Sequence, residues 1–105
     1  MGSCRSSGVL TADAVISAER CKLVSIHAQY TGSAATTVKV FDNASAASGK
    51  ELARIILFTD AAAPTAVKDV STVEFDMHGV ISLNGLFLEI SGAGGMGAAV
   101  SVEYN

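Results

Sequence analysis

Three segments in the last third of the chain alternate between apolar and more polar residues. Residues 72–77 (TVEFDM) carry the apolar row Val73, Phe75 and Met77, and residues 86–91 and 99–104 repeat the alternation. Successive strand side chains point to opposite faces, so each segment places one row on a core and one on solvent. Glycine-containing breaks separate the segments, and this order is typical of antiparallel β-structure.

The same reading predicts strands earlier in the chain and one short addition near its end, over residues 9–16, 21–30, 36–41 and 80–83. The strand over 21–30 is expected to turn Val24, Ile26, Ala28 and Tyr30 to one face. The residue pair Asp42 and Asn43 is a turn signal, because both side chains bond nearby backbone groups.

Two assignments are possible between residues 43 and 59. A helix over 43–57 is one, because Ala, Lys, Glu, Leu and Arg are good helix formers. A strand over 51–59 (ELARIILFT) is preferred, since its apolar run is short and has no helical stripe beside it. Residues 60–68, which contain the only proline, are predicted to form an irregular crossing.

About seven or eight short strands at a spacing of about 8–12 residues indicate a sandwich or barrel. The sequence therefore predicts an all-β fold: a single-domain antiparallel β-sandwich, jelly-roll-like, over residues 8–105. Residues 1–7 (MGSCRSS) are predicted to form a flexible N-terminal arm.

Composition favours a thin sandwich with a surface that contacts neighbours. Half of the residues are apolar, mostly small, and only 16% are charged. The net charge is −3 and the seven Lys and Arg residues are scattered, which argues against nucleic acid as a partner. No apolar run approaches the roughly 20 residues needed to cross a membrane, and residues 1–8 lack the apolar core of a signal peptide.

Residues 92–97 (GAGGMG) match the dinucleotide-binding pattern G-x-G-x-x-G. That reading requires a helix next and an acidic residue about 20 positions further on. Only eight residues follow, and they alternate like a strand. We therefore predict a hairpin loop at this position, and no bound cofactor.

No reactive constellation emerges from the remaining residues. His27 and His78 have no partner at metal-ligand spacing, and there is no G-x-S-x-G nucleophile elbow. Alternation places Glu74, Glu89 and Glu103 on outward faces, where a solvated role is expected. The sequence predicts a protein that is not an enzyme and has no metal site.

The two cysteines have different expected environments. Cys21 opens a predicted strand and is expected to be a buried free thiol, whereas Cys4 lies in the polar arm and is expected to be exposed. A bridge between Cys4 and Cys21, or one between subunits, remains an alternative.

Several short elements resemble a known family. They are the run VKVFDN at 38–43, the small-residue loop ending at Gly49, the run NGLFLEISG at 84–92 and the closing segment AVSVEY at 99–104. Together they resemble the small all-β virion proteins of tailed bacteriophages over about residues 12–104. The resemblance implies a β-sandwich without enzymatic activity, located in the virion after assembly in the host cytoplasm.

That resemblance implies a capsid decoration (cement) protein that binds the major capsid protein and forms a homo-oligomer, with a trimer favoured. A tail- or fibre-associated subunit is the alternative, and a carbohydrate-binding module is a third reading, although there is no Trp and only two Tyr to stack on sugar. Contacts are expected from the arm and three loops, at Cys4, Arg5, Asn43, Ser45, Pro64, Val67, Gly94 and Met96.

Overall fold

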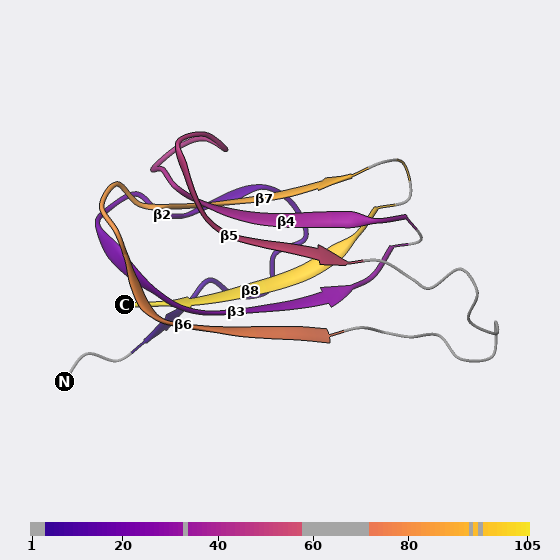
Figure 1. Ribbon diagram of the computed structural model, residues 1–105, viewed down its shortest axis with the longest axis horizontal. Helices are drawn as coiled ribbons and strands as arrows, with labels where there is room; N and C mark the ends of the chain where they lie inside the picture. The colour runs from indigo at the N-terminus through magenta and orange to yellow at the C-terminus, as the bar shows by residue number, and fades with distance from the viewer. Residues whose placement is uncertain (1–3, 33, 58–71, 93, 95) are drawn as a thin grey trace.

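The chain folds into two packed β-sheets in a computed structural model that describes residues 4–32, 34–57, 72–92, 94 and 96–105 (Figure 1). The strands are β1 (Arg5–Ser6), β2 (Ala14–Ser17), β3 (Cys21–Tyr30), β4 (Thr36–Asp42), β5 (Lys50–Leu57), β6 (Thr72–Ser82), β7 (Leu86–Gly92) and β8 (Ala98–Tyr104). No helix in the described ranges has the length and apolar character needed to cross a bilayer.

The strand order is that of a jelly roll. One sheet has the order β1-β8-β3-β6 and the other β2-β7-β4-β5. The first four strands pair antiparallel with the last four in reverse, as β1·β8, β2·β7, β3·β6 and β4·β5. Pairings β3·β8 and β4·β7 roll this double ladder into two layers. The predicted antiparallel, jelly-roll-like sandwich is confirmed.

The core lies between the inner faces of the two sheets. Alternate residues of the central strands face it, as their burial pattern shows for β7 and β8. Its largest fully buried apolar side chains are Leu23, Ile26, Leu57, Leu86, Leu88, Val38, Val40, Val100 and Val102. The alternation read from the sequence therefore identified the inner rows of the last two strands correctly.

The predicted first strand over residues 9–16 is wrong in its extent. Leu10 makes a single isolated bridge to Val100, and β2 begins only at Ala14. The physical reason is that β1 and β2 belong to different sheets, so the chain must cross between layers over the residues that separate them. Asp13 marks the crossing, since its side chain accepts a hydrogen bond from the main-chain N–H of Ile90 at 2.8 Å.

The predicted phase of β3 is wrong in its first half. The register shifts between Leu23 and Ser25 against both neighbouring strands. Against β8 the extra residue is Val24, which forms a β-bulge, whereas against β6 the extra residues lie in β6, between Asp76 and Val80. Because of the bulge at Val24, Cys21 and Leu23 face the core, and Val24 is only half-buried. From Ile26 onward the predicted inward row holds.

The helix considered for residues 43–57 does not form, and β5 runs over most of the alternative strand assignment. Residues 58–68, which include the end of that assignment and the predicted crossing, lie outside the described residues. The predicted short strand at 80–83 is instead the end of β6, which continues through a bulge at His78 and Gly79, both with positive φ (54° and 78°).

The predicted flexible arm is partly a strand. Arg5 and Ser6 form β1 against β8. Ser7 donates its main-chain N–H to the carbonyl of Val102, and its hydroxyl accepts from the N–H of Val102, each at 2.8 Å. The edge of β8 offers unpaired backbone groups, and these residues satisfy them. The domain therefore begins within the segment assigned to the arm.

Candidate functional site

The residues predicted to make contacts lie at opposite ends of the sandwich. Arg5 pairs with Tyr104, near the left end in Figure 1, and the loop with Asn43 and Ser45 lies at that end too. Gly94 and Met96 belong to the connection between β7 and β8 at the right end. Pro64 and Val67 lie outside the described residues. The structure thus divides the predicted set into two separate regions.

At the right end, the glycine-rich segment joins β7 to β8, and a strand follows it. The predicted hairpin is wrong, because β7 and β8 belong to different sheets and the segment crosses from one layer to the other. A strand follows the segment where a dinucleotide site would require a helix. Gly97 lies close to Thr31 and Gly32, donates its N–H to the Thr36 hydroxyl at 2.9 Å and accepts from the N–H of Thr31. Met96 is 42% exposed beside this fixed base.

At the left end, Asn43 organises the β4–β5 loop. Its Oδ1 accepts from the main-chain N–H groups of Ser45 and Ala46, at 2.9 and 3.0 Å. Its Nδ2 donates to the carbonyl and the hydroxyl of Ser48, at 3.2 and 3.1 Å. Because the amide is occupied within the loop, Asn43 shapes the surface that Ser45 presents and has little capacity left for a partner.

Asp42 links the β4–β5 loop to the turn between β6 and β7. Its Oδ1 accepts from the main-chain N–H of Asn84 and from the hydroxyl of Ser82, both at 2.8 Å. The bond from Asn84 lowers the pKa of Asp42, bonds from Ser82 and Leu83 add to this, and partial burial opposes them. The carboxylate is therefore held in its charged form by donors from the turn.

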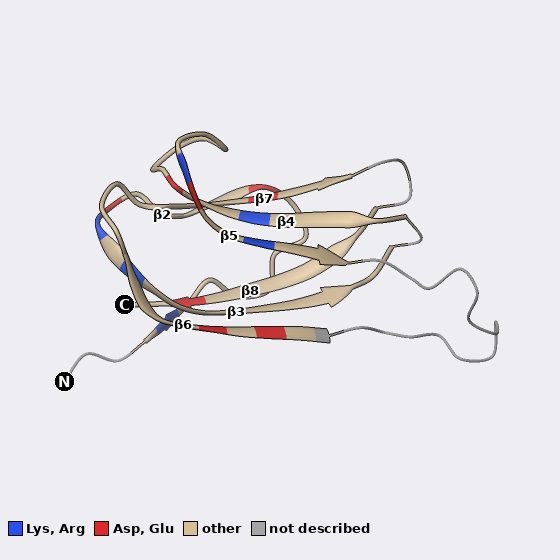
Figure 2. Ribbon diagram, viewed as in Figure 1, with Lys and Arg blue, Asp and Glu red and all other residues tan. Residues whose placement is uncertain are grey.

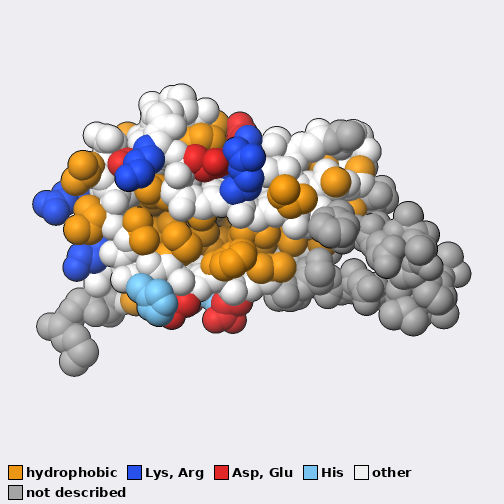
Figure 3. All heavy atoms as spheres, in the orientation of Figure 1, with side chains coloured by type: hydrophobic (Ala, Val, Ile, Leu, Met, Phe, Trp, Pro, Cys, Tyr) orange, Lys and Arg blue, Asp and Glu red, His pale blue; other side chains and the backbone are white. Residues whose placement is uncertain are grey.

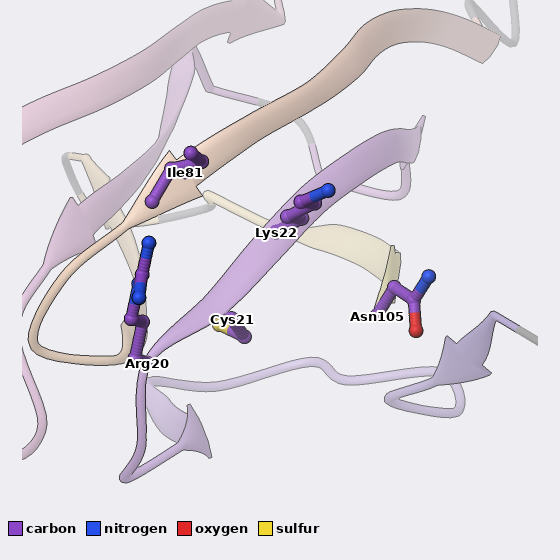
Figure 4. Close-up of a pocket in the computed structure, with 5 residues that line it drawn as sticks. All are labelled: Arg20, Cys21, Lys22, Ile81 and Asn105. Carbon is purple, nitrogen blue, oxygen red and sulfur yellow. The ribbon is translucent and has the colours of Figure 1, made fainter. Parts of the chain in front are cut away.

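A shallow pocket of about 300 Å³ opens at the start of β3 (Figure 4). Cys21 lines it and is 8% exposed, so the expected buried free thiol is confirmed. Burial raises the pKa of this thiol and the charge of Asp42 adds to the rise, while a hydrogen bond with Ser17 opposes it. A thiol kept protonated in this way is a poor nucleophile, which fits a packing role.

The other residues lining the pocket are Arg20, Lys22, Ile81 and Asn105. Lys22 and Asn105 exchange two main-chain hydrogen bonds at 2.9 Å, which hold the two strand ends together. Cys4 is exposed and free, as expected, and the alternative disulfide with Cys21 is not formed.

His27 lies on the outer face of β3 between two carboxylates. Its Nε2 is 3.0 Å from Oε1 of Glu103 on β8, and its Nδ1 is 3.6 Å from Oε2 of Glu74 on β6. Because the carboxylates approach opposite ring nitrogens, one cation does not fit between all three groups. No group of three or more His, Cys, Asp and Glu side chains within the described residues is arranged to hold a metal ion.

The hydroxyl of Ser25 lies 3.4 Å from the same Nε2 that Glu103 approaches. In a hydrolytic triad the serine and the acid lie on opposite ring nitrogens, as Ser25 and Glu74 do here, and the nitrogen nearer the serine accepts its proton. Here that nitrogen lies 3.0 Å from Glu103, closer than the Ser25 hydroxyl, so it is already paired with a carboxylate. The cluster instead connects β6, β3 and β8 across the outer face of one sheet.

The sequence did not indicate one surface, which lies between the edge strands β5 and β6 of the two sheets. We call it the open side, and its residues on the inner face of β6 are Val73, Phe75, Met77 and Val80. Phe75 pairs with buried Ile26, yet it is 45% exposed, and Val80 is 37% exposed. Figure 3 shows an apolar band there, between the charged side chains of the two edge strands. Alternation predicted Val73, Phe75 and Met77 to be core, because it indicates which face of a strand is apolar and not whether the strand lies at an edge.

A scan against protein-family models found no match, and searches of curated proteins and of solved structures found none. Over the residues that the structure describes, the fold defines the class of the protein as an antiparallel jelly-roll domain with eight strands.

Proposed function

We propose that this chain is a non-enzymatic structural protein of a tailed-phage virion and serves as a capsid decoration (cement) protein. It would bind the major capsid protein and stabilise the shell through contact area, not through chemistry at a single site. Virus capsids and lectins both use the jelly roll, so the fold is compatible with this role and does not by itself establish it.

The observation that supports the proposal best is that the two most distinctive motifs of the family resemblance meet in space. The motif ending in Asp42 and Asn43 contacts the motif that begins at Asn84 and Gly85. Asp42 accepts a hydrogen bond from the main-chain N–H of Asn84. A Cβ added to Gly85 would lie 3.1 Å from Cα of Ala44 and 3.3 Å from the carbonyl oxygen of Asn43, so the two backbones approach closely. Their joint presence thus has one physical cause, a latch between two loops at one end of a jelly roll.

The distribution of loops supports a bridging role. The β4–β5 loop and the N-terminal residues lie at one end of the sandwich, and the connection between β7 and β8 lies at the other (Figure 1). Bound through both ends, a rigid domain would connect two neighbouring shell subunits. Arg5 and Ser45 would contribute on one side, and Gly94 and Met96 on the other.

A carbohydrate-binding module is less well supported. Such modules stack sugar rings on exposed aromatic side chains. Tyr30 is only 5% exposed, and its hydroxyl donates to the carbonyl of Ala34 at 2.7 Å. Tyr104, the other tyrosine, is partly buried and packs against the core. Neither ring is presented for stacking.

The test is the copy number of the chain in gradient-purified particles of the phage that encodes it, measured by quantitative mass spectrometry against the major capsid protein. We expect hundreds of copies, near parity with the shell subunit. A few copies to a few dozen would instead assign the chain to the tail or a fibre, which is the alternative function. Absence from the particle would overturn the virion proposal.

A further inference from the structure

We propose that the open side of the sandwich is covered by a second copy of this chain, with β5 of one copy against β6 of the other. This inference concerns the isolated protein and does not depend on the virion role. It rests on three features of the described residues: an apolar band, two unpaired edge strands and charges of opposite sign on those strands.

The apolar band consists of side chains that face the inner side of β6 and yet remain exposed. Phe75 is an aromatic side chain on the inner face of β6, and it remains 45% exposed beside partly exposed Met77 and Val80. From the other sheet, Leu52 and Ala53 of β5 are also only partly buried. Contiguous apolar area of this kind on a small protein marks an interaction surface.

The two edges that border the band are long. In the described sheets, β5 pairs only with β4 and β6 only with β3, so each has one unpaired side. These strands have 8 and 11 residues, whereas β1 and β2 at the opposite edges have 2 and 4. Long unpaired edges beside apolar side chains invite pairing with another chain.

The charges of the two edges favour a copy of the same chain as the partner. The charged residues of β5 are Lys50, Glu51 and Arg54, for a net charge of +1 (two positive, one negative). Those of β6 are Glu74 and Asp76, for a net charge of −2 with His78 neutral. Figure 2 shows the two sets on the two edge strands, one on each sheet.

A rotation axis parallel to the strands would place β5 of each copy beside β6 of its neighbour, so that Arg54 faces Glu74 and Asp76. An axis perpendicular to the strands within the same interface would bring like edges together, which is unfavourable. The open side is therefore complementary to itself when the rotation axis is parallel to the strands. A closed dimer or trimer about this axis would cover the open side of every copy.

The available area is sufficient. Eleven residues of β6 at about 3.3 Å each extend about 36 Å. With sheets about 10 Å apart and about one strand spacing on each side, the surface measures on the order of 700 Å². A stable interface needs about 800 Å² per partner, so the open side with its charged borders is close to the standard size.

The experiment measures the mass of the purified full chain by native mass spectrometry and light scattering. We expect an oligomer for the unmodified protein and for Val9→Glu, which changes an apolar residue that is 72% exposed on the far side. Phe75→Glu should yield the monomer. A monomeric unmodified protein, or a Phe75→Glu variant that stays oligomeric, would overturn the proposal.

Charge reversal tests the arrangement even if Phe75→Glu fails to fold. Arg54→Glu or Glu74→Arg alone should raise the dissociation constant at least about tenfold through like-charge contacts. The double variant should return it to within about threefold of the unmodified value, because the two changes compensate across the interface. Single variants without effect, or a double variant weaker than either single one, would exclude β5 against β6.

The outcomes of this experiment and of the copy-number measurement are independent. A monomer found in hundreds of copies per particle would remove the open-side interface and leave the decoration role. An oligomer that is absent from particles would remove the decoration role and leave the open-side interface.

Discussion

Single residues at the left end of the molecule in Figure 1 hold two loops together, and Asp42 is central among them. Its carboxylate accepts from main-chain N–H groups of the turn after β6 and from the hydroxyl of Ser82 at the end of β6. Such bonds favour the charged form in the folded state, so the folded pKa lies below the unfolded one. The resulting stability is present above the unfolded pKa of about 4 and is lost as the pH falls through the folded pKa.

Replacing Asp42 with Asn should lower the free energy of unfolding by about 1 kcal/mol at pH 7, because a charged acceptor of several hydrogen bonds is removed. The difference from the unmodified protein should shrink as the pH falls below about 4, since Asp42 becomes protonated in both states. Urea unfolding at a series of pH values measures it. Glu19→Ala, in the exposed loop after β2, is the control at pH 7 and should cause no loss. A difference that is constant from pH 7 to pH 2 would contradict this account.

Gly85, in the same latch, has φ +133°, and a Cβ there would lie 2.4 Å from the carbonyl oxygen of Ser17 and 3.1 Å from Cα of Ala44. Gly85→Ala should therefore lower the free energy of unfolding by roughly 2–3 kcal/mol, through backbone strain and the displacement of two backbone segments.

Gly94→Ala is the matched control, because a Cβ at Gly94 meets no atom within 4 Å. Chemical unfolding of both variants should show a stability loss confined to the first. Equal stability of the two proteins would contradict this account, because it would mean that the backbone around Gly85 accommodates a side chain without cost.

At the scale of elements, β1 is the clearest departure from the sequence prediction. It covers the edge of β8 with strand pairing and two hydrogen bonds between Ser7 and Val102. The sequence indicates an arm for the same residues because they are polar and close to the terminus. Polarity does not prevent a short edge strand, since the backbone supplies the bonds.

Deleting residues 1–7 should therefore lower the free energy of unfolding by about 1–2 kcal/mol, because the edge of β8 loses its partner. Deleting residues 1–4 keeps β1 and should leave stability unchanged within about 0.5 kcal/mol. Thermal and urea unfolding of the two truncated proteins measure this. If both deletions also reduce binding to capsids, only the shorter one identifies a contact made by the N-terminal residues, because the longer one alters the fold.

At the scale of the whole molecule, two kinds of surface are separated. The loops at the two ends carry most of the described residues predicted to contact other proteins, whereas the apolar open side lies along the edges between the ends. Self-association through the open side would leave both ends accessible. The decoration role and the self-association proposed here are thus compatible in one molecule, and each has its own measurement.

The sequence by itself determined the all-β class, five of the strands to within a residue or two, and the buried Cys21. The hairpin predicted at residues 92–97 is instead a crossing between the two sheets. Alternation and turn residues act over a few positions, so they specify individual strands directly but not the sheet that each strand joins. For β5, the short apolar run in the sequence was enough to favour a strand over a helix.

Only the tertiary structure decided the features that depend on neighbouring strands. The bulge at Val24 changes the face of half a strand, and the bulge at His78 and Gly79 joins two predicted strands into β6. The position of β6 at an edge turns Phe75 from core into surface. These features follow from which strands lie side by side, and pairing between distant segments is set by the packing of the whole chain, not by any local pattern.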